Sequence, residues 1–174
     1  TTMTLSGADA SNYQVIQPSG LTADITGKAL TVTGAAATSR VYDSSTIIAV
    51  SGGSLVGVEL NDVVTLIDAN AAGALADKSV GTNRPVTVTG YLLGGANAGN
   101  YTVTQPTALT ATITPKPLTI SGALGVDKRF DGNTTASIDV TNATLVGVET
   151  GDSVTIGVGS VTGTFADKNV GTGK

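Results

Sequence analysis

The chain of 174 residues carries 9 Lys and Arg against 13 Asp and Glu, which gives a formal net charge of −4. This acidic balance argues against nucleic acid as a partner, because no basic stripe is present to release counterions from phosphates. The sequence has no Cys, His or Trp, which excludes a disulfide scaffold, a thiolate metal site and a Ser-His-Asp triad.

We therefore expect that the protein is not an enzyme and that it has no catalytic or cofactor-binding residues. No apolar run approaches the length that spans a bilayer, so we expect no membrane insertion. The chain begins at Thr1 without a signal peptide, and we expect it to be an internal piece of a longer protein.

Apolar and polar residues alternate in short runs along the chain, which predicts β-strands, and no helical period appears. One buried and one solvated face favour antiparallel sheets, and about seven short strands per repeat are typical of a sandwich. The predicted fold is all-β, with tandem small antiparallel β-sandwich (Ig-like) repeats. In chain order, the residues expected to face inward are Leu21, Ala23 and Ile25; Leu30 and Val32; Val86 and Val88; Tyr101 and Val103; Leu109, Ala111 and Ile113; and Val154, Ile156 and Val158.

The chain contains two copies of one repeat. The segment that starts at Leu5 aligns without a gap to the one that starts at Leu93, an offset of 88 residues. The segments LVGVELND and LVGVETGD align at an offset of 90 residues, so an insertion lies before Leu145. Such self-similarity indicates a repeat architecture. Two divisions fit: a complete repeat over residues 28–115, between the last strands of one repeat (1–27) and the first part of the next (116–174), or two copies over 1–86 and 87–174.

Under the first division, residues 1–27 are separated from their partner strands, and residues 116–174 lack their last strands. An open strand edge is a site for pairing with another chain. We therefore expect the partners to be neighbouring repeats or copies of the same chain, assembled head to tail by strand complementation through these open edges.

Five segments of the chain carry a recognisable pattern: RVYDSST (40–46), LVGVELNDVVTL (55–66), ADKSVGT (76–82), NAGNYTVTQP (97–106) and LTATITPKPLTI (109–120). They resemble the YDG-type tandem repeat of large secreted bacterial adhesins and filamentous-haemagglutinin-like exoproteins. Phe130 replaces the motif tyrosine in the second copy, and Ser44 replaces the motif glycine in the first. The resemblance covers essentially the whole chain. It implies a secreted or bacterial cell-surface protein, with no catalytic residues to transfer.

The function that this resemblance implies is structural, with the repeats forming the stalk or shaft of a surface adhesin or an extracellular filament. The alternative is an adhesin module that binds extracellular polysaccharide or another glycan. Such a module usually exposes aromatic rings, and Tyr91 is the candidate because it has no aromatic counterpart in the other copy. The other aromatic residues in strand-like positions are interpreted as core, namely Tyr13, Tyr42, Tyr101 and Phe130.

Acidic residues recur at equivalent positions of the two copies, and calcium is the cofactor that they could hold, because Ca²⁺ binds hard oxygen ligands. The alternative interpretation is turn chemistry, in which each Asp side chain bonds the backbone of its own turn. The candidate calcium ligands are Asp43, Asp62, Asp77, Asp131, Asp152 and Asp167.

A second candidate site is an intramolecular isopeptide bond between Lys28 and Asn100, with Glu59 as proton shuttle. That reaction needs a neutral, desolvated Lys beside apolar residues. The alternative is a Lys at a strand end that extends its ammonium to water. Lys78 and Lys168 follow an Asp in the two ADK turns, and we expect them to be solvated turn charges.

Overall fold

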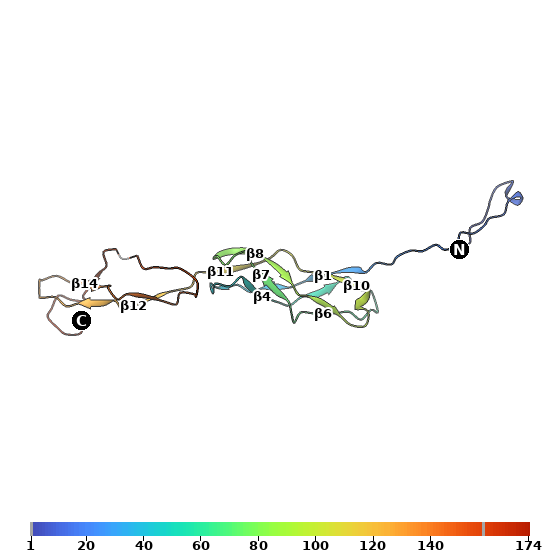
Figure 1. Cartoon of the computed structure of the whole chain (residues 1–174). Helices are drawn as coiled ribbons and strands as arrows, with labels where there is room; N and C mark the ends of the chain where they lie inside the picture. Colours follow the sequence, from blue (N-terminus) through green and yellow to red (C-terminus); the bar gives the residue numbers. More distant parts are fainter. Residues whose placement is uncertain (1, 158) are drawn as a thin grey trace.

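The computed structural model describes residues 2–157 and 159–174, and it confirms the predicted all-β class. Short strands make up the regular structure, together with two 3-10 helices, η1 (Ala10–Asn12) and η2 (Ala98–Asn100). The molecule is elongated, with β1–β11 in the middle, β12–β16 at one end and the N-terminal residues extending from the other (Figure 1).

We call residues 28–114 the first unit and residues 116–174 the second unit. The strands of the first unit are β1 (Lys28–Thr33), β2 (Ala36–Ala37), β3 (Arg40–Val41), β4 (Ile47–Ser51), β5 (Ser54–Val56), β6 (Thr65–Ile67), β7 (Ala72–Ala74), β8 (Gly81–Thr89), β9 (Leu92–Gly94), β10 (Tyr101–Thr104) and β11 (Leu109–Thr114). The strands of the second unit are β12 (Thr119–Ser121), β13 (Leu124–Val126), β14 (Thr135–Asp139), β15 (Thr144–Val146) and β16 (Thr162–Thr164).

The largest sheet of the first unit has the strand order β2-β4-β7-β8-β11-β3. Its two edge strands, β2 and β3, are separated in sequence by only Thr38 and Ser39, so the sheet curls round until its edges approach each other. Ser39 helps to fill the gap, because its hydroxyl accepts the Thr112 N–H of β11 at 2.8 Å. A three-stranded sheet, β10-β1-β5, and the pair β6-β9 complete the unit.

Two strand pairs differ from the expected antiparallel arrangement. β1 pairs with β10 in parallel, with Lys28 opposite Tyr101, and β3 pairs with β11 in parallel. A tight hairpin can join only antiparallel neighbours, whereas strands far apart in the chain are free to pair in either direction. Hairpin spacing in the sequence therefore left these remote pairs undetermined. Each of these pairs joins a strand before residue 86 to a strand after residue 87, where the alternative division of the chain places its boundary. Which of the two divisions gives the repeat stays a prediction.

The core of the first unit follows the predicted alternation. Leu30 is fully buried and Val32 is nearly so on β1, and Ala111 and Ile113 point inward on β11. The remaining buried residues of the main cluster are Ile48, Leu75, Val86, Val88 and Tyr91. Burial of the Leu, Ile and Val side chains in this cluster supplies much of the driving force, since each contributes about 1.5–3 kcal/mol.

Two predicted strands are absent. Residues 21–26 form no strand, and Leu21 and Ile25 are 78% and 100% exposed. The run at 154–158 also forms no strand over the residues described, with Val154 51% exposed; Val158 lies outside the described residues. Alternation indicates that a segment can join a sheet, but a strand forms only where the segment can pair with the edge strand of a sheet. Neither segment has a strand partner among the described residues.

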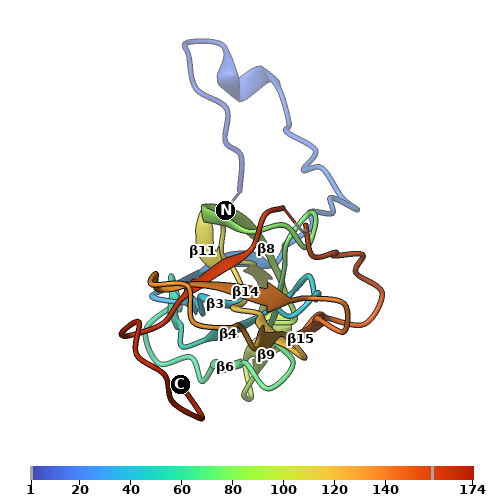
Figure 2. The same cartoon turned by 90° about the vertical axis from the view of Figure 1, so that its left-hand side faces the viewer.

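The second unit repeats part of the first. Ile120 pairs with Leu145 as Val32 pairs with Leu55, and β13-β14-β16 corresponds to β2-β4-β7. Burial differs sharply between the copies, since Ile120 is 59% exposed and its counterpart Val32 is 7% exposed. The reason is that β1 lies between β10 and β5, whereas β12 has β15 as its only described neighbour. Figure 2, turned so that the end with the second unit faces the viewer, shows β14 and β15 of this unit.

Candidate functional site: the junction between the two units

The two units meet at a polar contact around Asp152. The Tyr42 hydroxyl donates a hydrogen bond of 2.6 Å to Oδ2 of Asp152, and the Lys78 ammonium binds Oδ1 of the same carboxylate. The Asp152 side chain is only 15% exposed, so this contact removes most of it from water. Both oxygens of one carboxylate in the second unit thus bind side chains of the first unit.

Local structure places each of the three side chains. Tyr42 directly follows β3, and its N–H donates to the carbonyl of Thr114, the last residue of β11. Lys78 lies in the turn between β7 and β8, and Asp152 lies in a turn where its N–H donates to the Glu149 carbonyl. Since strand ends and tight turns hold all three, the junction is built on rigid elements.

A bond network also fixes the Lys78 turn. The Asp77 carboxylate accepts the Ser79 N–H at 2.8 Å and pairs with the Arg84 guanidinium at 2.8 Å. Arg84 is the main cause of a strongly lowered Asp77 pKa, with the Ser79 bonds contributing. Asp77 therefore stays ionised and orders the turn that presents Lys78.

The charges at the junction reinforce one another. The hydrogen bond from Lys78 is the main cause that lowers the pKa of Asp152, and the Tyr42 hydroxyl adds to it. The same bond raises the pKa of Lys78. The bond to Asp152 is also the main cause of the raised pKa of Tyr42. Near neutral pH the junction therefore consists of a carboxylate, an ammonium and a neutral phenol.

The equivalent aspartate of the first unit, Asp62, serves a contact within its own unit. Its Oδ2 accepts the hydroxyl of Tyr101 on β10, and that hydroxyl in turn accepts the Glu59 N–H at 3.2 Å. The hydrogen bond to Asp62, followed by burial, raises the pKa of Tyr101. One loop type, residues 57–62 and its copy 147–152, thus binds a tyrosine within the unit in one case and across the junction in the other.

The acidic calcium candidates are dispersed. Asp43 binds Arg40 and its own turn at Ser45, and Asp131 binds Lys128 and Asn133 in the same way. Within residues 2–157 and 159–174, no three acidic side chains gather into a group that could hold a metal. The remaining candidates are placed by the contacts of Asp62, Asp77 and Asp152 described above and by the bond between Asp167 and Lys174.

The isopeptide candidates are only partly brought together. Lys28 Nζ lies 2.5 Å from Oε1 of Glu59, and these side chains are 47% and 65% exposed. Asn100 is exposed and directly precedes Tyr101, the residue in register with Lys28. The same ion pair recurs between Lys116 and Glu149 at 2.5 Å. Exposure of this degree keeps Lys28 solvated and does not supply the desolvation that the reaction needs.

The aromatic predictions need correction. Tyr91, the candidate exposed ring, is 0% exposed, and its hydroxyl donates to the Gly52 carbonyl at 2.6 Å. Tyr13 and Phe130, expected in the core, are 73% and 63% exposed. Tyr91 belongs to the buried cluster and is held there by residues remote in sequence, because its N–H donates to Oε1 of Gln105 and its hydroxyl to Gly52. The other two rings lie in segments that lack neighbouring strands.

Sequence reasoning missed the junction. The core interpretation of Tyr42 holds in part, because its ring packs against the buried cluster. The pattern does not predict that its hydroxyl, or Lys78, binds Asp152. A signal was present, because RVYD has the counterpart KRFD and the ADK and GVExxD segments recur in both copies. No spacing in the sequence indicated that the first two would meet the third in the next repeat.

The fold and the junction define an all-β tandem-repeat protein whose units are linked end to end. The family model of the YDG domain matches residues 26–108 and 114–174, so the chain belongs to the YDG domain family. No curated protein and no solved structure matches the chain. No helix in the described residues is long and apolar enough to cross a membrane.

Proposed function

We propose that these repeats are structural modules that form the stalk or shaft of a bacterial surface adhesin or extracellular filament. The observation that carries the proposal is the junction, in which one unit holds the Asp152 carboxylate of the next through Tyr42 and Lys78. A stalk needs successive modules at a defined angle, and a two-point contact to one carboxylate restricts rotation between them. The family resemblance adds a secreted or cell-surface location to this proposal.

The linker between the units supports the same function. β11 ends at Thr114 and β12 begins at Thr119, so four residues, Pro-Lys-Pro-Leu, join them. Each proline fixes its own φ, which makes a short linker of this composition stiff. Lys116, between the prolines, is held by Glu149 at 2.5 Å, so the linker is also tied to the second unit.

Strand complementation between copies is the proposed route to a filament. Residues 13–16 correspond in sequence to β10, and they extend away from the first unit without a described strand partner (Figure 1). β12, the counterpart of β1, has β15 on one side and no described strand on the side where β1 receives β10. A parallel pair between residues 13–16 of one molecule and β12 of another would reproduce the β1–β10 pair.

The junction can be tested by fluorescence energy transfer within the full chain. The sequence has no Cys, so Leu92→Cys and Leu124→Cys, both at exposed positions, give unique labelling sites in the two units. We expect a narrow distance distribution that broadens with Asp152→Ala. The matched control is Asp62→Ala, which removes the equivalent carboxylate from the first unit and should leave the distribution narrow.

Equal broadening with both variants, or none with Asp152→Ala, would show that the contact does not set the arrangement of the units. Glycan binding, the alternative function, is tested separately by titrating the unmodified chain with soluble polysaccharides. A stalk module should show no saturable binding, and saturable binding would favour the alternative.

A further inference from the structure

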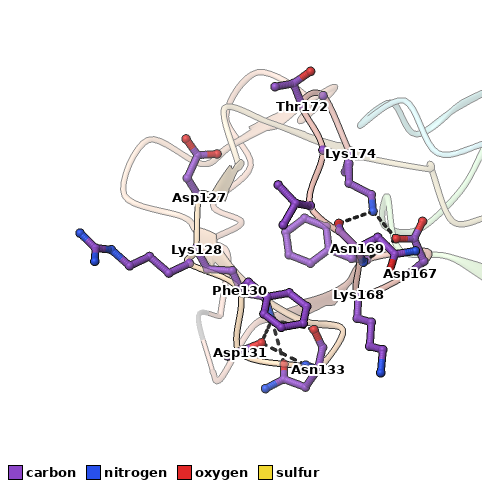
Figure 3. Close-up of a pocket in the computed structure, with 15 residues that line it drawn as sticks. Asp127, Lys128, Phe130, Asp131, Asn133, Asp167, Lys168, Asn169, Thr172 and Lys174 are labelled. Atoms are coloured by element: carbon purple, nitrogen blue, oxygen red, sulfur yellow. Dashed lines mark hydrogen bonds and ion pairs between the residues drawn. The ribbon is translucent and has the colours of Figure 1, made fainter.

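The end of the second unit carries a hollow of about 500 Å³ between the turns at residues 127–133 and 165–174 (Figure 3). Phe130, Phe165 and Lys168 are among the residues that line it. We call these three residues, with the two turns that carry them, the distal surface.

The distal surface is the second copy of the surface that binds Asp152. By position in the repeat, Phe130 corresponds to Tyr42 and Lys168 corresponds to Lys78. Phe165 likewise corresponds to Leu75, which is buried in the first unit. In the first unit this surface is covered by the turn of the second unit, whereas Phe130 is 63% exposed.

The cations at the distal surface differ in how they are used. Lys128 binds Asp131 and Asn133, and Lys174 binds Asp167 and Asn169 (Figure 3). Among the described residues, neither Lys168 nor Arg129, which also lines the hollow, makes a side-chain hydrogen bond or ion pair. Arg129 corresponds to Val41, whereas Lys168 corresponds to Lys78, the lysine that binds Asp152. Lys168, the counterpart of the lysine that binds Asp152 in the first unit, is therefore available to bind a carboxylate of another molecule.

We propose that the distal surface binds the loop at residues 57–62 of a second copy of this chain, with Lys168 pairing to the Asp62 carboxylate. This loop is the copy of the one that carries Asp152, so its shape fits a surface of this type. Its charge fits as well. Oδ2 of Asp62 is taken by the Tyr101 hydroxyl, while Oδ1 accepts no side-chain donor from the described residues. One open oxygen on the loop thus meets one open ammonium on the surface.

The substitution of Tyr by Phe at position 130 sets the strength of this contact. The Tyr42 junction has two donors for its aspartate, and at the equivalent positions of the distal surface Lys168 is a donor whereas Phe130 is not. The inference rests on the proposed head-to-tail assembly and adds two features to it, the docking residues and an order of strength. Junctions of the Tyr type hold firmly, and junctions of the Phe type open first.

The test is nuclear magnetic resonance of the isotope-labelled full chain over a series of concentrations. Amides of residues 57–62 and 165–170 should shift together as the concentration rises. Lys168→Gln should weaken the association roughly two- to five-fold, as expected for the loss of a partly exposed ion pair. Phe130→Tyr should strengthen it about three-fold by restoring a hydrogen-bond donor. Asp139→Asn is the control and should change nothing, because it neutralises one exposed charge of the second unit, at the end of β14, outside both the distal surface and the loop at residues 57–62.

The same spectra separate this inference from strand complementation. Shifts in residues 13–16 and in β12 report strand pairing, and shifts in the loop and the turn report docking. If only the strands shift, or if Lys168→Gln and Asp139→Asn behave alike, docking at the distal surface is wrong while the assembly proposal stands. If no amide shifts at any concentration, both are wrong. In every case the fluorescence test of the Asp152 junction is unaffected.

Discussion

Leu30 and Leu118 occupy the same position in the two copies, and truncating each to Ala measures how much the neighbouring strands contribute. Leu30 is 0% exposed, between β10 and β5, whereas Leu118 is half-buried. Leu30→Ala removes three carbons, which is about 2.4 kcal/mol of transfer free energy, and the cavity brings the total to about 3–5 kcal/mol. Leu118→Ala leaves little cavity and should cost about 1 kcal/mol.

Tyrosine fluorescence during urea unfolding is a suitable assay, because Tyr42, Tyr91 and Tyr101 lie in the first unit and residues 116–174 contain no Tyr. Leu30→Ala should move the fluorescence transition to much lower urea, and Leu118→Ala should barely move it. If the two variants shifted the transition equally, or if Leu30→Ala cost less than about 1.5 kcal/mol, the packing described for β1 would be refuted.

Three further predictions concern the junction and the backbone. Asp152 has a pKa lowered from 3.8, so its stabilisation of the junction is present above that pH and is lost as the pH falls through the lowered value. The raised pKa values of Tyr42 and Lys78 place the alkaline limit of this stabilisation above about pH 10. The fluorescence distance distribution should therefore broaden only below the acid limit or above the alkaline one. Tyr91→Phe leaves the Gly52 carbonyl without its donor and should lower the free energy of unfolding by about 1–2 kcal/mol, measured by urea unfolding followed by circular dichroism. Gly90 and Gly34 both have positive φ, but a Cβ at Gly90 would overlap the Asn70 carbonyl while one at Gly34 meets open space. Gly90→Ala should therefore lower the free energy of unfolding by about 2–4 kcal/mol and Gly34→Ala by about 1 kcal/mol, measured by thermal unfolding. Equal losses would contradict the close approach of Gly90 to Asn70.

Much of the fold could be predicted because it follows from local pattern. Alternation identified the inward residues of β1, β8 and β11, since a side chain's face is fixed by its position in the strand. The parallel pairs β1–β10 and β3–β11 could not be predicted, because turn chemistry constrains only neighbouring strands. Residues 21–26 show the converse, since their pattern is strand-like and they form no strand without an edge to join.

The candidate site was predicted less well, for a different physical reason. Asp152, Tyr42 and Lys78 were each recognisable as recurring polar or aromatic positions, yet their contact spans 110 residues and two units. Long-range contacts of this kind depend on how whole units are placed. The burial of Tyr91 could not be predicted for a related reason, because the residues that hold it, Gly52 and Gln105, are remote from it in the sequence.

The central claim is that the repeats are joined end to end as a shaft. It is tested most directly by small-angle X-ray scattering of the chain and of versions lengthened by one and then two copies of residues 28–115, inserted between Pro115 and Lys116. The account predicts that the maximum dimension grows by the same increment with each added copy. An increment that shrinks with each copy, or a dimension that stays constant while the mass rises, would show that the repeats fold back on one another and would contradict the claim.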